Sequence, residues 1–267
     1  MEHINVIKVG GAVVENPASL AGLLDRFAQM PGAKVLVHGG GRAATRIAES
    51  LGIKSRMVGG RRVTDERMLQ VVTMVYGGLV NKNVVAALQQ RGVNAVGLTG
   101  ADMNVMLSHR RAPKETRMDD GSTQTVDFGF VGDIDRVDGG RLASLAAEGL
   151  VPVMAPLTHD GQGHLLNTNA DTIASQVACV LTPYYRVTLT FCFEKKGVLA
   201  NPDDDNSVIS HISRQEFHRL VSEGVIAGGM RPKLENSLEA IHRGVSQVII
   251  TSADDPEGKR GTTIKEF

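Results

Sequence analysis

The chain has 267 residues, of which 42% are hydrophobic, and its 29 basic and 29 acidic residues give a formal net charge of zero. This length is enough for one large α/β domain or for two lobes that share a sheet, and the neutral balance argues against a nucleic-acid-binding protein. We find no apolar run long enough to span a bilayer and no signal peptide before the first predicted strand. Cys179 and Cys192 are the only cysteines, which argues against a disulfide framework or a cysteine-rich zinc site and predicts a cytoplasmic globular protein.

Short β-branched runs alternate with helical patterns along the chain. We expect strands at Ile4–Val9, Lys34–His38, Ala95–Leu98, Met103–Ser108, Val151–Ala155, Val187–Phe193 and Gln247–Thr251. We expect helices at Leu20–Gln29, Ala43–Leu51, Asp65–Arg91, Leu142–Glu148, Ala170–Val180, Arg214–Glu223 and Pro232–Arg243. The alternation predicts an α/β fold, a three-layer αβα sandwich with a mostly parallel central sheet.

Two segments interrupt this alternation. Polar and turn-forming residues between Arg110 and Gly132 predict a β-hairpin that lies over a site rather than in the core. The segment "TPYYR", residues 182–186, ends a helix and contains a proline, so we interpret it as a hinge. The chain would then divide into an N-terminal lobe, 1–181, and a C-terminal lobe, 182–267.

Lys8 lies inside the apolar run "INVIKVGG" and is followed closely by Gly10 and Gly11. A lysine in a buried strand is costly unless its ammonium group finds a partner. The two glycines leave the backbone after the strand free of side chains, which allows close approach of a ligand. The run therefore indicates a ligand site, with a partner for Lys8 that must come from elsewhere in the chain.

A second strand runs into Gly39, Gly40 and Gly41 and then into a helix. Gly39, Gly41 and Ala44 fit the dinucleotide fingerprint G-x-G-x-x-A. That fingerprint normally follows the first strand and precedes an acidic residue by about 20 positions, and neither condition holds here. An NAD(P)-dependent oxidoreductase is therefore the alternative, beside an anion site at a helix N-terminus.

Two further segments place polar residues at predicted helix starts. "LLNTNADTIA" contains Asn167, Asn169 and Asp171, and helix capping by Asn169 explains the pattern as well as a functional role does. "GVIAGGMRPK" places Gly229 and Lys233 around the start of a helix. The histidines show no metal or nucleophile spacing, so we expect a reaction that needs no general base.

Six motifs occur in the order that is typical of the amino acid kinase family: "IKVGGAVV", "VHGGGRAA", "GGRRVTDERML", "NKNVVAAL", "LLNTNADTIA" and "GGMRPKLENSLEAI". The resemblance covers almost the whole chain, and the series is far more specific than any single motif. The segments around Arg62 and Asn167 are most similar to those of the members that act on N-acylated glutamate.

The resemblance implies that ATP donates its γ-phosphoryl group to the side-chain carboxylate of N-acetyl-L-glutamate, a step of arginine biosynthesis. N-succinyl-L-glutamate is the alternative substrate. The accepting carboxylate is already ionised at neutral pH, so no base is required. Mg²⁺ would arrive with ATP and be coordinated by phosphates and water, and no protein metal ligand is expected.

The resemblance also assigns roles to residues of this sequence. Lys8 and Lys233 would hold the transferred phosphoryl group from opposite sides, and Asp171 would orient both ammonium groups. Gly40, Gly41, Arg62 and Asn167 would bind the substrate, whereas Gly10, Gly11, Gly229 and Lys233 would bind the phosphates of the nucleotide.

The resemblance also has implications for assembly, and one segment of the chain departs from the family pattern. Arginine-inhibited members of the family carry an extra N-terminal helix, and this chain enters its first strand at Ile4, so a homodimer insensitive to arginine is implied. Helix 65–91 would form much of the interface, although its apolar face is equally compatible with ordinary core. The segment "FCFEKKGVL" has Glu194 where the family commonly has aspartate, which indicates either divergence or altered nucleotide contacts.

Overall fold

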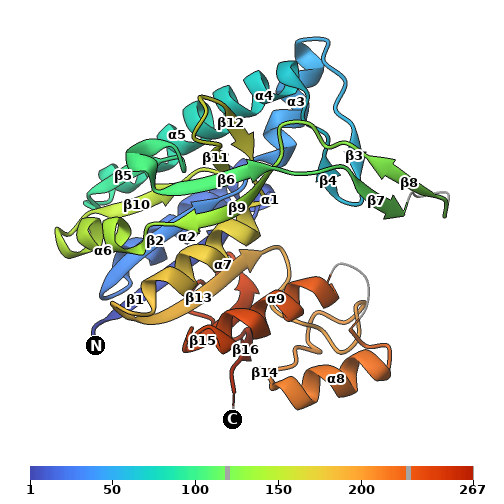
Figure 1. Cartoon of the computed structure of the whole chain (residues 1–267). Coiled ribbons are helices and arrows are strands. Elements are labelled where there is room, and N and C mark those ends of the chain that lie inside the picture. The colour runs from blue at the N-terminus through green and yellow to red at the C-terminus, as the bar shows by residue number, and fades with distance from the viewer. Residues whose placement is uncertain (118–120, 227–229, 267) are drawn as a thin grey trace.

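The computed structural model describes residues 1–117, 121–226 and 230–266. An eight-stranded sheet runs through the molecule in the order β14-β16-β15-β13-β1-β2-β10-β5 (Figure 1). Its strands are β14 (His211–Ile212), β16 (Thr262–Ile264), β15 (Gln247–Ser252), β13 (Arg186–Phe193), β1 (His3–Val9), β2 (Ala33–His38), β10 (Val151–Met154) and β5 (Ala95–Leu98). Every neighbouring pair is parallel except β15 and β16, which confirms the predicted fold class.

Helices cover both faces of this sheet (Figure 1). The helices are α1 (Gly11–Glu15), α2 (Pro17–Gln29), α3 (Gly41–Ser50), α4 (Glu66–Val72), α5 (Asn81–Gln90), α6 (Gly139–Ala147), α7 (Ala170–Leu181), α8 (Arg214–Ser222) and α9 (Met230–His242). The two faces bury separate apolar cores: α6, α7, α8 and α9 supply one, and the helices from α1 to α5 supply the other. The three-layer arrangement follows from these two cores.

The central strand β1 shows how the layers orient the site. Ile4 and Val6 belong to the core under α7, whereas Ile7 and Val9 belong to the opposite core. Because successive side chains of a strand point to opposite faces, Lys8 continues the row of Ile4 and Val6. Its side chain is therefore directed towards the α7 layer, at the carboxyl end of β1.

Short strands form a second sheet and two ribbons. The sheet has the order β12 (Leu165–Asn167), β11 (Leu157–His159), β6 (Met106–Arg110) and β9 (Gly132–Val137). The ribbons pair β3 (Met57–Val58) with β4 (Arg61–Arg62) and β7 (Lys114–Arg117) with β8 (Thr123–Val126). The predicted hairpin within 110–132 is confirmed by β7 and β8, which project from the body of the protein (Figure 1).

The strand predicted at Met103–Ser108 begins later than expected. Residues Asp102–Asn104 form the short 3₁₀ helix η2, and Met103 and Asn104 have φ angles of 54° and 53°. Backbone in this left-handed region cannot continue a strand. The Asp102 carboxylate accepts hydrogen bonds from the Thr99 backbone N–H and hydroxyl, which closes the turn.

The predicted helix 65–91 is one continuous segment of three parts, α4, the π-helix η1 (Thr73–Val80) and α5. The expectation that no apolar run could span a membrane is wrong by length and hydropathy, since Glu66–Gln90 has 25 residues and meets both criteria. This is weak evidence for a span, because core helices of soluble proteins meet them too. Apolar side chains all along the segment are buried in the core: Met68, Val71, Val72, Val75, Val80, Val84 and Leu88.

Candidate active site

Lys8 finds its partner at the start of α7. The Lys8 Nζ atom lies 2.7 Å from Asp171 Oδ1, and the two side chains are 11% and 31% exposed. The contact is an ion pair rather than a well-aligned hydrogen bond. Asn169 caps α7 by accepting from the Thr172 backbone N–H at 3.0 Å, so Asp171 is held in the first turn of the helix.

The two neighbouring lysines together lower the pKa of Asp171 more than burial raises it. Burial by itself raises the pKa of this carboxyl group, but Lys8 and Lys233 lower it, and the net pKa lies below the usual value. Asp171 is therefore a carboxylate at neutral pH. The positive end of the α7 dipole favours the same ionised form.

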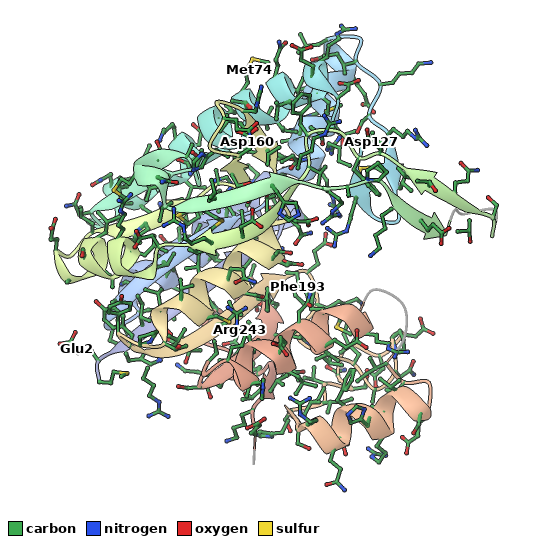
Figure 2. The ribbon with its side chains drawn as sticks, viewed as in Figure 1. Glu2, Met74, Asp127, Asp160, Phe193 and Arg243 are labelled. Carbon is green, nitrogen blue, oxygen red and sulfur yellow. The ribbon has the colours of Figure 1, made fainter. Side chains whose placement is uncertain are left out.

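Lys233 approaches the same place from α9. Its Nζ atom lies 3.9 Å from the centroid of the Phe193 ring, at the end of β13. Phe193 lies where the strands of the sheet meet α9 (Figure 2). Burial lowers the pKa of Lys233, Asp171 raises it and Lys8 lowers it further, with a net decrease. The two lysines and Asp171 thus interact electrostatically, and their predicted catalytic roles remain predictions.

The two glycine loops abut each other at the carboxyl ends of β1 and β2. A Cβ atom added to Gly39 would lie 2.9 Å from the Gly11 nitrogen. The Gly10 backbone N–H donates to the Cys192 carbonyl, so this predicted phosphate contact is already used within the sheet. Gly11 and Gly41 begin α1 and α3, where backbone N–H groups have no acceptor inside the helix. Gly229, also predicted to bind phosphate, lies outside the described residues.

All four residues that were predicted to bind the substrate line one cavity of about 190 Å³: Gly40, Gly41, Arg62 and Asn167. The Arg62 side chain donates to the Gly41 carbonyl at 2.7 Å, to Thr45 Oγ1 at 2.8 Å and to the Ser55 hydroxyl. Asn167 donates to Thr64 Oγ1 at 2.9 Å. The cavity thus brings together segments that are more than a hundred residues apart in the sequence.

One buried donor in this cavity has no protein acceptor. Arg62 is only 8% exposed. Within the described parts of the chain, its Nε atom is buried and makes no hydrogen bond. An unpaired donor on a charged guanidinium group costs free energy unless a ligand or water satisfies it. Arg62 lines the cavity, and arginine binds carboxylates through several aligned N–H groups.

Sequence reasoning did not identify every residue of the cavity. Tyr76 on η1 lines it, as do Pro156 and Thr168. Tyr76 belongs to an apolar helical run, where its spacing indicates core packing and gives no sign of a ligand contact. Pro156 and Thr168 lie in connections beside the small sheet, whose position the hydrophobic pattern did not reveal.

A second, largely apolar cavity of about 660 Å³ lies beside Phe193 and the beginning of α9. Val198, Leu199, Pro202 and Val225 contribute to its walls. Lys195 lies at its edge and pairs with Asp205 at 2.7 Å, and Arg42 on α3 lies 3.6 Å from Glu194. The divergent segment 191–199 thus lines this second cavity.

His38 is the buried base at the end of β2, next to the glycine loop. Its side chain is 0% exposed, and Nδ1 donates to the Gly39 carbonyl at 2.8 Å while Nε2 accepts from Asn81 Nδ2 at 3.2 Å. Burial lowers the pKa of His38 to about 4, although the bond to Gly39 raises it. Both ring nitrogens of this buried imidazole are therefore hydrogen-bonded, and His38 is neutral at physiological pH.

Because the pKa of His38 is lower in the folded than in the unfolded chain, its contribution to stability is complete above pH 6.5 and is lost as the pH falls towards 4. We expect a loss of about 3 kcal/mol over this range. His38→Gln should flatten this part of the pH dependence of the free energy of unfolding, measured by urea denaturation. The exposed control His218→Gln should keep the wild-type slope, and an equally steep slope in His38→Gln would contradict the assignment.

Comparison with known proteins places these features in a family. A model of the amino acid kinase family matches residues 3–252. The acetylglutamate kinase of Bacteroides thetaiotaomicron is 60% identical over 265 residues, which are 99% of each chain. The crystal structure of smu.665 from Streptococcus mutans UA159 is 27% identical with a TM-score of 0.78 and covers 98% of both chains.

A more distant solved structure has the same fold. Carbamate kinase from Giardia lamblia bound to AMP-PNP is 16% identical, with a TM-score of 0.67 over 100% of this chain and 99% of that one. At this identity the likeness shows the fold alone. The match of the family model and the identity to the Bacteroides thetaiotaomicron protein both extend over nearly the whole chain. The chain therefore belongs to the amino acid kinase family.

Proposed function

We propose that the protein transfers the γ-phosphoryl group of ATP to the side-chain carboxylate of N-acetyl-L-glutamate, in arginine biosynthesis. The observation that carries the proposal is the cavity that combines Gly40, Gly41, Arg62 and Asn167. The names of the relatives favour the acetyl substrate over the succinyl alternative. They also give no support to an NAD(P)-dependent oxidoreductase, whose fingerprint here forms part of the cavity wall instead.

In the proposed reaction the substrate carboxylate is already a nucleophile, and the protein's task is to reduce charge repulsion. Lys8 and Lys233 would bring positive charge to the transferred phosphoryl group, while Asp171 keeps the two ammonium groups in place. The amides of Gly11 and Gly41 would donate to phosphoryl and substrate oxygens. Arg62 would bind the α-carboxylate. Positioning and electrostatic stabilisation account for most of the rate in phosphoryl transfer.

ATP is proposed to occupy the apolar cavity beside Phe193, where its base would contact Val198, Leu199 and Val225. Magnesium would enter as the MgATP complex, held mainly by phosphates and water. The part of the chain that the structure describes has no group of three or more acidic, histidine or cysteine side chains able to hold a metal ion. The substrate complex would therefore supply most of the ligands of its own ion.

Domain division and assembly are proposed on the same basis. Residues 1–181 would bind the acylglutamate and form the dimer, and residues 182–267 would bind ATP, with a hinge at 182–186. The homodimer would use the long helix, on which Met74 and Leu79 are 55% and 50% exposed. Met74 points away from the body of the protein (Figure 2). A cytoplasmic location is proposed because the reaction uses soluble metabolites.

A direct test compares N-acetyl-L-glutamate, N-succinyl-L-glutamate and free glutamate with ATP, and traps the acyl phosphate as a hydroxamate. We expect the largest kcat/KM with N-acetyl-L-glutamate and no hydroxamate in the absence of Mg²⁺. A preference for free glutamate would contradict the proposed substrate class. Binding of NAD without binding of ATP would favour the oxidoreductase alternative.

A further inference from the structure

Tyr76 is a buried tyrosine in the wall of the substrate cavity, and the proposed mechanism does not use it. It is 5% exposed and lines the cavity together with Gly40 and Arg62. A phenylalanine would fill the same apolar space without burying a hydroxyl group, which costs free energy unless it is hydrogen-bonded. The hydroxyl group of Tyr76 therefore needs a hydrogen-bond partner at this site.

The ring of Tyr76 is seated against the second glycine loop. A Cβ atom on Gly40 would lie 2.9 Å from Tyr76 Cδ1 and 3.1 Å from Cε1. Contacts this short show that the ring packs directly on the backbone of Gly40. Tyr76 thus fixes the position of the loop whose amides lead into α3 and face the cavity.

Tyr76 and Arg62 line the same cavity and interact electrostatically. Burial raises the pKa of Tyr76, and the charge of Arg62 and a side-chain hydrogen bond with it lower the pKa, with a net increase that keeps the phenol protonated at neutral pH. A guanidinium group has only donors, so only the oxygen of the Tyr76 hydroxyl group, and not its hydrogen, can pair with Arg62. The hydroxyl hydrogen is not used there and can donate to a ligand in the cavity.

Tyr76 lies on the π-helix η1 of the long helix. Tyr76 and Val80 both contact the place of a Gly40 Cβ, and Asn81 also points inwards, donating to the Val153 carbonyl at 2.9 Å. In an α-helix, residues five apart point about 140° away from each other. The wider turn of η1 directs Tyr76 and Asn81 to the same side, and such π segments are frequent at functional sites.

We propose that Tyr76 is a specificity-determining residue of the acylglutamate site. Its hydroxyl group positions Arg62 and donates a second hydrogen bond to the carboxylate that Arg62 binds. The ligand class is an N-acylated amino acid with a free α-carboxylate. This inference rests on the role proposed above for Arg62.

The test uses Tyr76→Phe, which removes only the hydroxyl group. We expect the KM for N-acetyl-L-glutamate to rise about tenfold, as for loss of a hydrogen bond to a charged group, while kcat, the KM for ATP and the thermal midpoint stay close to wild type. The matched control is Thr251→Val, which removes another buried hydroxyl group, bonded to the Asp255 carbonyl at 3.1 Å. The control should leave all these kinetic values unchanged.

Arg62→Lys and the double variant separate the two proposals. If Arg62→Lys raises the KM for N-acetyl-L-glutamate but Tyr76→Phe does not, the role of Tyr76 is overturned and the proposed function stands. If Arg62→Lys has no effect on this KM, both are overturned. We expect the double variant to raise KM by less than the product of the single effects, since coupled residues are not additive. A full product would overturn the positioning of Arg62 by Tyr76.

Discussion

Replacing Lys8 by alanine is expected to lower kcat about 10³-fold, with little change in the affinity for N-acetyl-L-glutamate. Lys8 ends a row of side chains that faces α7, and its ammonium group is fixed by Asp171 at 2.7 Å. A cation held in this way needs no reorganisation when negative charge builds up during transfer. Its removal also leaves Asp171 as a partly buried carboxylate without its nearest counter-charge, which adds to the repulsion of ATP.

Lys34→Ala is the matched control for this variant. Lys34 lies on the neighbouring strand β2, and its ammonium group donates to the carbonyls of Ala28 and Met30 at 3.2 Å and 2.6 Å. The control is expected to lose stability but to keep kcat. Steady-state kinetics and circular dichroism of both variants make the comparison. A folded Lys8→Ala protein with wild-type kcat would refute the mechanism.

Asp171→Asn is expected to reduce kcat about 10²-fold through loss of positioning of the two lysines. The amide keeps the size of the side chain and removes its charge, so both ammonium groups lose the carboxylate that attracts them. The matched control Asp138→Asn alters another aspartate at the start of a helix, where it caps α6 by accepting from the Arg141 backbone N–H at 3.1 Å. This control should keep kcat.

The same variant has an effect on the pH profile that a purely structural role would not produce. Asp171 raises the pKa of Lys233, against the lowering by burial and by Lys8. Without the carboxylate the pKa of Lys233 must fall further, and the lysine is active only when protonated. The alkaline limb of the kcat profile should therefore move to lower pH in Asp171→Asn. An unmoved limb would mean that Lys233 does not act as the proposed cation.

Local patterns were sufficient for the main elements of the fold. Ala95–Leu98 was predicted with the bounds of β5, because a short, largely apolar run between turn signals has few alternatives. Gly92, Gly149, Gly224 and Gly244 follow helices and have positive φ angles, which glycine adopts most readily. The π segment in the middle of helix 65–91 escaped prediction, since its apolar pattern is compatible with an ordinary α-helix.

Strands that depend on distant partners were not predicted. β11 and β12 have three residues each, and β3 and β4 have two, so their periodicity is too short to detect. Each is defined by its pairing with another segment rather than by its own sequence. The walls of the cavity come largely from these connections, which is why Pro156 and Thr168 were missed.

The sequence by itself determined the family, the order of the strands and helices along the chain, and the candidate residues of the site, because motifs and periodicity are local properties. Only the tertiary structure decided which charges and donors meet. Lys8 pairs with Asp171 across 163 positions because alternation on β1 turns Lys8 towards α7 and capping by Asn169 holds the start of that helix. Tyr76 enters the cavity because the π-helical part of the long helix packs against the glycine loop before α3. Such contacts depend on how separate elements pack, and no segment contains that information alone.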